Sequence, residues 1–210
     1  PFVETNKLGG KDPYSASKAA SEILISSYNQ SFFKDFNTNI AIARAGNVIG
    51  GGDWSDNRLI PDIIKATNTH TLVHIRNPKA IRPWQHVLEP LFGYLMLGVA
   101  LHQNPKRHSL SWNFGPQIDD TKTVEEIINI GIKLEIVGQV VYEESTLVEA
   151  QSLKLNITKA KKEFGFKPVW NSEQSISKTF EWYNNYYQKN LTAKDLIDKD
   201  LKTYLNQVEC

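Results

Sequence analysis

Two residues near the start of the chain could perform acid-base chemistry. Tyr14 and Lys18 stand four residues apart in a segment with helical spacing, so both side chains lie on one helix face. A tyrosine hydroxyl accepts a proton near neutral pH only where its phenolate is stabilised, and a neighbouring ammonium supplies that stabilisation. The pair could therefore take a proton from a substrate hydroxyl. Because Tyr-x-x-x-Lys also occurs by chance, the surrounding sequence has to decide.

Arginines and histidines further along could hold an anionic ligand. Arg58, Arg76 and Arg82 fall in loop or strand-end segments, where planar guanidinium groups can bind a diphosphate through paired hydrogen bonds. Taken singly, each is more simply a solvated surface arginine. His74 and His86 could contact the same ligand, although a histidine in a strand is more often part of the packing.

Other conspicuous residues are most simply explained by roles in the fold rather than in chemistry. The tryptophans expected in the core are Trp84, Trp112, Trp170 and Trp182. Glu89 opens a predicted helix, where a carboxylate is stabilised by the helix dipole. The single cysteine, Cys210, excludes an intrachain disulfide and a thiol-rich metal site, so we expect no metal and a cytoplasmic protein.

Composition narrows the possible partners. Among 210 residues, 24 are Lys or Arg and 23 are Asp or Glu, so no charge excess favours nucleic acid or an anionic membrane. The longest mainly apolar stretch, 90–101, contains Gly93 and Gly98 and is too short to cross a bilayer. We therefore expect a globular protein whose anionic ligand is held by local charge.

Apolar periodicity and turn residues predict alternating helices and strands. Helices are expected over residues 14–33, 60–67, 89–102, 123–134 and 172–187, with another ended by Gly165. Strands are expected over 39–45, 71–75, 109–114 and 139–143. The expected N-caps are Asp12, Thr123, Thr158 and either Asn171 or Ser172, and a polar helical tail follows Asn190. Such alternation indicates an α/β fold with parallel strand pairing.

The sequence contains no strand, glycine-rich turn and helix unit that could seat a pyrophosphate. The glycines at 50–52 precede Asp53 and Trp54 rather than a helix, so we interpret them as a flexible or substrate-side loop. Pro1 is not an initiator residue, and the first residues resemble neither a signal peptide nor a transit helix. We therefore interpret the opening as the middle of a protein.

The residues around Tyr14 decide its interpretation. The string DPYSASKAASE, from Asp12, resembles the extended short-chain dehydrogenase/reductase family of NAD-dependent epimerases and dehydratases. RAGNVIGGGDW from Arg44, RLIP from Arg58, RNPKAIRPWQHV from Arg76 and WNFGP from Trp112 continue the resemblance. Together they cover roughly residues 1–187.

This resemblance implies roles for individual residues. Tyr14 would be the base and Lys18 would bind the nicotinamide ribose of NAD, so both belong to the catalytic and cofactor-binding sets. The implied substrate-binding residues are Asn47, Arg58, Leu59, His74, Arg76 and Arg82. In the family the dehydration step uses a threonine and two further acid-base residues located before the tyrosine, and these are not found in this chain. The resemblance therefore implies that the dinucleotide-binding half is missing and that this chain is inactive alone.

The resemblance also implies a fold and its division. We expect the C-terminal part of a Rossmann-like doubly wound parallel sheet plus a smaller α/β substrate-binding domain. Residues 1–50 would belong to the Rossmann domain and 51–190 mainly to the nucleotide-sugar-binding domain, with some segments returning to the Rossmann domain. Residues 191–210 would form a helical or disordered tail.

GNVIGGGDW together with the RPW string most resembles the CDP-glucose 4,6-dehydratases within this family. That implies conversion of CDP-glucose, or a similar nucleotide sugar, to CDP-4-keto-6-deoxyglucose by a homodimer, in deoxysugar biosynthesis such as that of the lipopolysaccharide O-antigen. An epimerase of the same family, or a non-catalytic nucleotide-sugar-binding fragment, remains the alternative.

Overall fold

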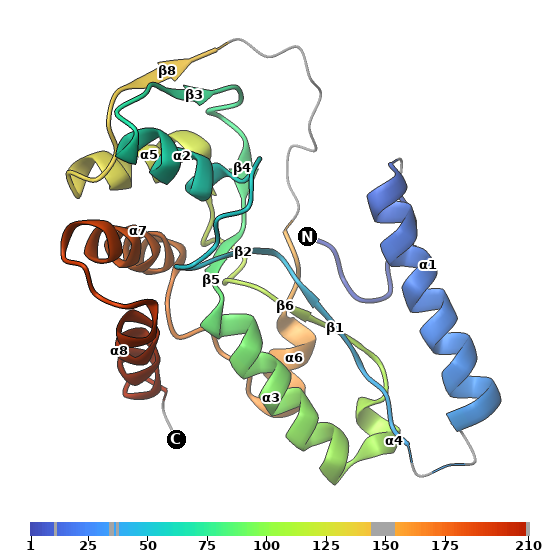
Figure 1. Ribbon diagram of the computed structural model, residues 1–210. Helices are drawn as coiled ribbons and strands as arrows, with labels where there is room; N and C mark the ends of the chain where they lie inside the picture. The colour runs from blue at the N-terminus through green and yellow to red at the C-terminus, as the bar shows by residue number, and fades with distance from the viewer. Residues whose placement is uncertain (11, 34–35, 37, 144–153, 209–210) are drawn as a thin grey trace.

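Helices alternate with groups of short strands over most of the chain, as the apolar periodicity predicts, and consecutive helices follow the last strand (Figure 1). The computed structural model describes residues 1–10, 12–33, 36, 38–143 and 154–208, so Cys210 lies outside the described residues. The helices are α1 (Pro13–Tyr28), α2 (Leu59–Asn68), α3 (Leu88–Gln103), α4 (Pro105–His108), α5 (Val124–Lys133), α6 (Thr158–Phe164), α7 (Ser172–Gln188) and α8 (Ala193–Leu205). The strands are β1 (Ile42–Ala45), β2 (Asn47–Ile49), β3 (Val73–Ile75), β4 (Ile81–Arg82), β5 (Trp84–His86), β6 (Ser111–Phe114), β7 (Lys122–Thr123) and β8 (Val140–Tyr142).

Strand pairing is mostly parallel. β1 pairs with β6, β2 with β5 and β3 with β8, all in parallel, which agrees with the predicted α/β class. The short β4–β7 pair is antiparallel, with Ile81 opposite Thr123, and departs from the expectation. A tight turn closed by the Ala80 amide on the Asn77 carbonyl (3.1 Å) redirects the chain between β3 and β4.

Caps position most helix ends as expected, with one correction. Thr123 and Glu126 form the predicted capping box, and Asn171, rather than Ser172, caps α7. Thr158 is not the N-cap of α6: it is the first helical residue, and its amide donates to Asn156 Oδ1 at 2.8 Å. Asparagine two residues earlier therefore supplies the acceptor that we expected from the threonine.

Several elements differ in extent or were not predicted. The helix expected over 14–33 is α-helical to Tyr28 and continues as a π-helix, η1 (Asn29–Phe33). The elements that were not predicted are the one-turn helix α4 and the strands β2, β4, β5 and β7, because elements this short carry almost no periodicity. Past Asn190 the expected tail is helix α8, which buries Leu196 and Tyr204.

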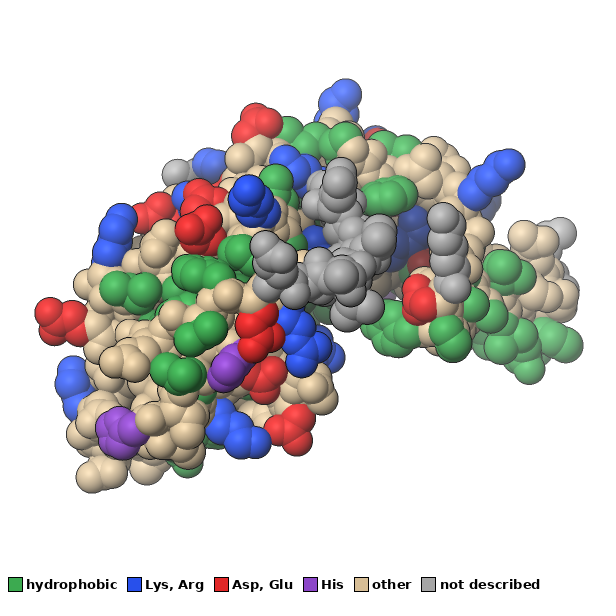
Figure 2. All heavy atoms as spheres, turned by 90° about the horizontal axis from the view of Figure 1, so that it is seen from above, with side chains coloured by type: hydrophobic (Ala, Val, Ile, Leu, Met, Phe, Trp, Pro, Cys, Tyr) green, Lys and Arg blue, Asp and Glu red, His purple; other side chains and the backbone are tan. Residues whose placement is uncertain are grey.

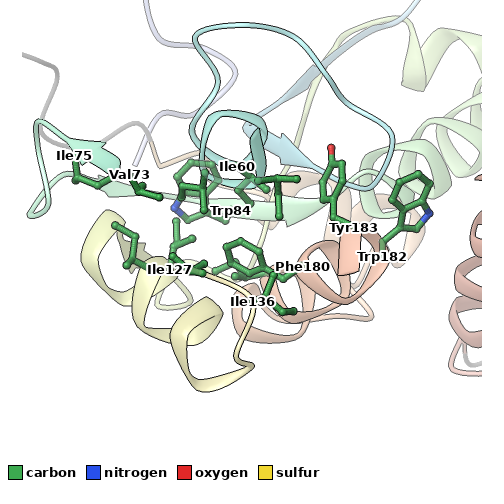
Figure 3. Close-up of a cluster of buried hydrophobic side chains, with 14 of the residues drawn as sticks. Ile60, Val73, Ile75, Trp84, Ile127, Ile136, Phe180, Trp182 and Tyr183 are labelled. Atoms are coloured by element: carbon green, nitrogen blue, oxygen red, sulfur yellow. The ribbon is translucent and has the colours of Figure 1, made fainter. Parts of the chain in front are cut away.

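Buried apolar side chains form two clusters. The larger joins α2, α5 and α7 with β3 and includes Ile63, Ile127 and Phe180, each at most 1% exposed (Figure 3). The smaller lies around β6 and contains Trp112 and Phe114. The predicted core tryptophans Trp84, Trp112, Trp170 and Trp182 are all buried. Burial of each such side chain contributes about 1.5–3 kcal/mol or more to folding.

Helix α1 stands apart from both clusters. None of its residues is buried, and its apolar Ile23 and Leu24 are 60% and 58% exposed. In Figure 2 hydrophobic side chains gather at the right-hand end, where Figure 1 places α1, whereas acidic and basic groups intermix over the rest of this face. No helix in the described part of the chain is long and apolar enough to span a bilayer.

Candidate active site

The Tyr14–Lys18 pair lies on the first turns of α1. Asp12 caps this helix by accepting a hydrogen bond from the Ser15 amide (3.0 Å), and Pro13 occupies the first turn. The Lys18 ammonium lies 5.6 Å from the centroid of the Tyr14 ring, which is 72% exposed. The structure therefore places a cation beside a tyrosine that a ligand can reach, as the spacing predicts.

One ion pair fixes this helix to the sheet. Arg44, on β1, binds Glu22, on α1, in a bidentate manner, with Nε–Oε1 at 2.7 Å and Nη2–Oε2 at 2.5 Å. Arg44 also donates to the Glu4 carbonyl at 3.3 Å. Both partners are mostly buried, with side-chain exposures of 20% and 16%. Paired hydrogen bonds of this kind set direction as well as distance, so they fix the orientation of α1.

A separate cleft of about 670 Å³ gathers the predicted substrate residues. Asn47 begins β2, and Arg58 and Leu59 stand where α2 begins. The remaining predicted residues in its lining are His74, Arg76 and Arg82, from β3, the segment after it and β4. Residues from four separate segments thus converge on one concave site. Tyr14 and Lys18 are not among its lining residues.

The cleft is suited to an anion. The N-terminus of α2 borders it, and the N-cap residue Arg58 makes no side-chain capping bond, so the first-turn amides keep their partial positive charge. Three arginines add formal charge, whereas Asp53 and Asp62 in the same lining offset part of it. Guanidinium groups at a helix N-terminus are the donors that a diphosphate requires.

Two of the predicted residues already have partners within the protein. His74 Nδ1 lies 2.6 Å from Glu143 Oε1, which ties β3 to the residue after β8. Arg82 Nη1 donates to the Ile81 carbonyl at 2.9 Å. These contacts orient both side chains at the cleft wall.

Several lining residues were not predicted. Asp53, Asn57, Asn77 and Trp84 also face the cleft, Trp84 with part of a side chain otherwise in the core. Asn57 has a left-handed backbone (φ 62°), a conformation that asparagine tolerates and that marks a tight turn. Gly50 lies in the lining as well, which supports our interpretation of the glycine run as a substrate-side loop.

The described residues fit an NAD nicotinamide but not its pyrophosphate. Tyr14 and Lys18 are open to a ring and ribose placed beside α1. The glycine run after β2 is not built as a phosphate cradle, because a Cβ at Gly51 would collide with the ring of Trp182 and α2 begins only at Leu59. Within the described ranges, no group of His, Cys, Asp or Glu side chains is arranged to hold a metal ion.

His86 and Glu89 belong to the interior. His86 is 2% exposed, packs edge-on against Trp170 with ring centroids 4.8 Å apart, and burial lowers its pKa to about 4. Glu89 is fully buried and accepts hydrogen bonds from the amides of Val169 (3.0 Å) and Trp170 (2.7 Å). The helix dipole is therefore only part of the reason for a carboxylate at position 89.

Comparison with known proteins identifies the family of this chain. The sequence profile described as GDP-mannose 4,6-dehydratase matches residues 1–179. The CDP-glucose 4,6-dehydratase of Salmonella typhimurium is 41% identical over 189 residues, which cover 87% of this chain and 53% of that protein. The chain thus spans about half the length of the curated relatives it matches.

Solved structures share the fold. A dTDP-glucose 4,6-dehydratase from Bacillus anthracis in complex with NAD superposes with a TM-score of 0.72 at 23% identity, covering 93% of this chain and 58% of that one. A UDP-glucose 4-epimerase from Stenotrophomonas maltophila with bound NAD gives 0.75 at 16% identity, covering 90% and 60%. Dehydratases and epimerases are equally similar in architecture, so the fold does not separate the two activities.

Proposed function

The chain belongs to the GDP-mannose 4,6-dehydratase family, and from that premise we propose that it carries the substrate cleft and the Tyr-Lys pair of an NAD-dependent nucleotide-sugar 4,6-dehydratase. CDP-glucose is the proposed substrate, in line with the 41% identity to a CDP-glucose 4,6-dehydratase. The observation that carries the proposal is the convergence of Asn47, Arg58, Arg76 and Arg82 on one cleft.

The cleft would bind the diphosphate of the substrate. Arg58, Arg76 and Arg82 would pair with phosphate oxygens, Asn47 would donate an amide hydrogen bond, and Leu59 would pack against the nucleoside. These contacts are the same in substrate and product, so they give affinity and orientation rather than rate.

The chemistry would begin at Tyr14. Its oxygen would accept the proton of the sugar 4-hydroxyl as C4 is oxidised to a ketone, while the Lys18 ammonium stabilises the phenolate. When bound, NAD would supply the acceptor for the C4 hydride and, after water is lost, the donor of that hydride to C6. Water would leave across C5 and C6 between the two hydride transfers, so the whole reaction has no net oxidation. No residue of this chain is assigned to the proton transfers at C5 and at the C6 hydroxyl.

The protein would work in the cytoplasm as a homodimer. The protein expressed from its complete gene should be titrated by calorimetry with CDP, UDP and GDP. We expect CDP to bind most tightly, in line with the relationship to the CDP-sugar enzyme. Equal affinity for all three would leave a nucleoside diphosphate site but remove the assignment of the base. Absence of binding to any of them would overturn the proposed cleft.

A further inference from the structure

The loop between β2 and α2, residues 50–58, has two different faces. One face borders the cleft, where Gly50, Asp53, Asn57 and Arg58 contribute to the lining. Residues 51–57 carry no regular strand or helix, and Gly52 has a left-handed backbone (φ 84°). A segment of this kind does not hold its own shape, so the position of Arg58 depends on what the other face contacts.

The other face is attached to an aromatic surface on α7. The hydroxyl of Tyr183 donates to the Asp53 carbonyl at 2.5 Å, and Trp54 Nε1 donates to the Tyr187 hydroxyl at 3.1 Å. Trp54 also meets the rings of Trp182 (6.0 Å between centroids) and Tyr186 (5.6 Å). Side-chain groups of α7 thus hold both the main chain and the indole of the loop.

Close packing reinforces this attachment. The main chain at Gly51 lies so near the Trp182 ring that a Cβ there would overlap it. Trp182 and Tyr183 are 3% and 1% exposed, so they form a fixed platform within the larger core (Figure 3). Burial raises the pKa of Tyr183 to about 12, which keeps its hydroxyl protonated and available as a donor.

We propose that Tyr183 and Trp54 are positioning residues, which bind the 50–58 loop to α7 and thereby aim Arg58 at the diphosphate. The inference rests on the proposed function, because it concerns the ligand of the same cleft. Neither side chain needs to touch the ligand. Tyr183 acts through the Asp53 carbonyl, and Trp54 acts through its contacts with Trp182, Tyr186 and Tyr187.

Tyr183→Phe tests the inference with little change in volume, because it deletes the hydroxyl and keeps the ring. In the protein as its gene encodes it, CDP affinity should fall about five- to tenfold, the effect of one lost hydrogen bond. Tyr204→Phe is the matched control: it deletes a comparable hydroxyl, which bonds Glu89 at 3.0 Å outside the cleft. That variant should lower the melting temperature and leave CDP affinity unchanged.

A double-mutant cycle separates positioning from general loosening. If Tyr183 acts through Arg58, the loss of affinity caused by Tyr183→Phe should shrink to less than about twofold in an Arg58→Ala background. A Tyr183→Phe loss that persists undiminished in that background would overturn the inference, as would unchanged CDP affinity in the single variant.

Hydrogen exchange of the ligand-free protein provides a test that does not need the nucleotide. Tyr183→Phe and Trp54→Phe should each speed exchange of the amides of residues 51–57, with α5 unchanged. Unchanged protection of this loop would contradict the attachment itself. If the wild-type protein bound no nucleoside diphosphate, the proposed function would fail, and the exchange rates would still decide whether α7 holds the loop.

Discussion

His86 Nε2 lies 4.0 Å from Asp200 Oδ2 in the interior between β5 and α8. Burial lowers the pKa of His86 from its ordinary 6.5 to about 4, with a further lowering by Lys178. Burial also raises the pKa of Asp200 from 3.8 to about 6. Folding therefore favours the neutral form of each group. Between about pH 4 and pH 6 the pair holds one proton in the folded protein, on Asp200, and one in the unfolded chain, on His86. Within that window, stability should not depend on pH through this pair.

Asp200→Asn should expose the pH dependence of His86. In that variant His86 binds a proton below pH 6.5 in the unfolded chain, but only below about pH 4 in the folded protein. The stability contributed by neutral His86 is then complete above 6.5 and is lost as pH falls, by about 1.4 kcal/mol per pH unit. Urea unfolding across this range measures the slope.

Asp198→Asn, on the exposed side of α8, is the control and should leave the pH profile of the wild type unchanged. His86→Gln should give the opposite slope, because Asp200 alone makes stability fall as pH rises from 3.8 to about 6. A flat profile in Asp200→Asn would show that folding does not lower the pKa of His86.

Among the carboxylates of the described residues, replacement of Glu89 should lower the free energy of unfolding the most. It accepts bonds from two amides and from the Tyr204 hydroxyl, and so joins α3 to α8 and to the segment before α7. Glu89→Ala leaves these donors without an acceptor and should lower the free energy of unfolding by roughly 3 kcal/mol. Glu163→Ala, which breaks an exposed pair with Arg107, should have little effect. Equal unfolding midpoints for the two variants would contradict the role of Glu89.

Elements with clear periodicity could be predicted from the sequence, whereas the contacts between elements could not. We could predict the Thr123–Glu126 capping box, the α/β class and the core tryptophans, because each depends on residues close together in the chain or on hydrophobicity alone. The role of Glu89 could not be predicted, since its partners lie at positions 169, 170 and 204. The attachment of Trp54 to α7 could not be predicted either, because its partner Tyr187 is also distant in the sequence.

The candidate site shows the same division. The arginines that line the cleft were found by type and resemblance, and the structure brings them together. No binding role was predicted for Asn77, because its place in the lining depends on the turn before β4. The Tyr14–Lys18 pair was found from spacing, which a helix converts directly into proximity.

Arg82→Ala should weaken CDP and CDP-glucose alike, by about ten- to a hundredfold, because a charge-assisted contact is lost from ground and transition states together. Calorimetry with both ligands measures the change. Arg107→Ala serves as the control, since Arg107 pairs with Glu163 and is not in the cleft lining. An Arg82 variant with wild-type affinity for CDP would remove this residue from the diphosphate site.

Tyr14→Phe should reduce turnover by about 10²–10⁴-fold and leave CDP affinity intact, because only the proton-accepting oxygen is lost. Steady-state kinetics and calorimetry on the same preparation separate the two effects. Tyr28→Phe removes a hydroxyl from the exposed surface of the same helix and should retain full turnover. Turnover of Tyr14→Phe within tenfold of the wild type would contradict the assignment of the base.

The mass of the sugar product tests the central claim most directly. The protein expressed as its gene encodes it should be incubated with NAD and CDP-glucose, and the CDP-sugar analysed by mass spectrometry and NMR. A 4,6-dehydratase gives a product lighter by one water, with a keto group at C4 and a methyl group at C6. A product of unchanged mass with inverted C4 would identify an epimerase and contradict the proposed function, as would recovery of unreacted CDP-glucose.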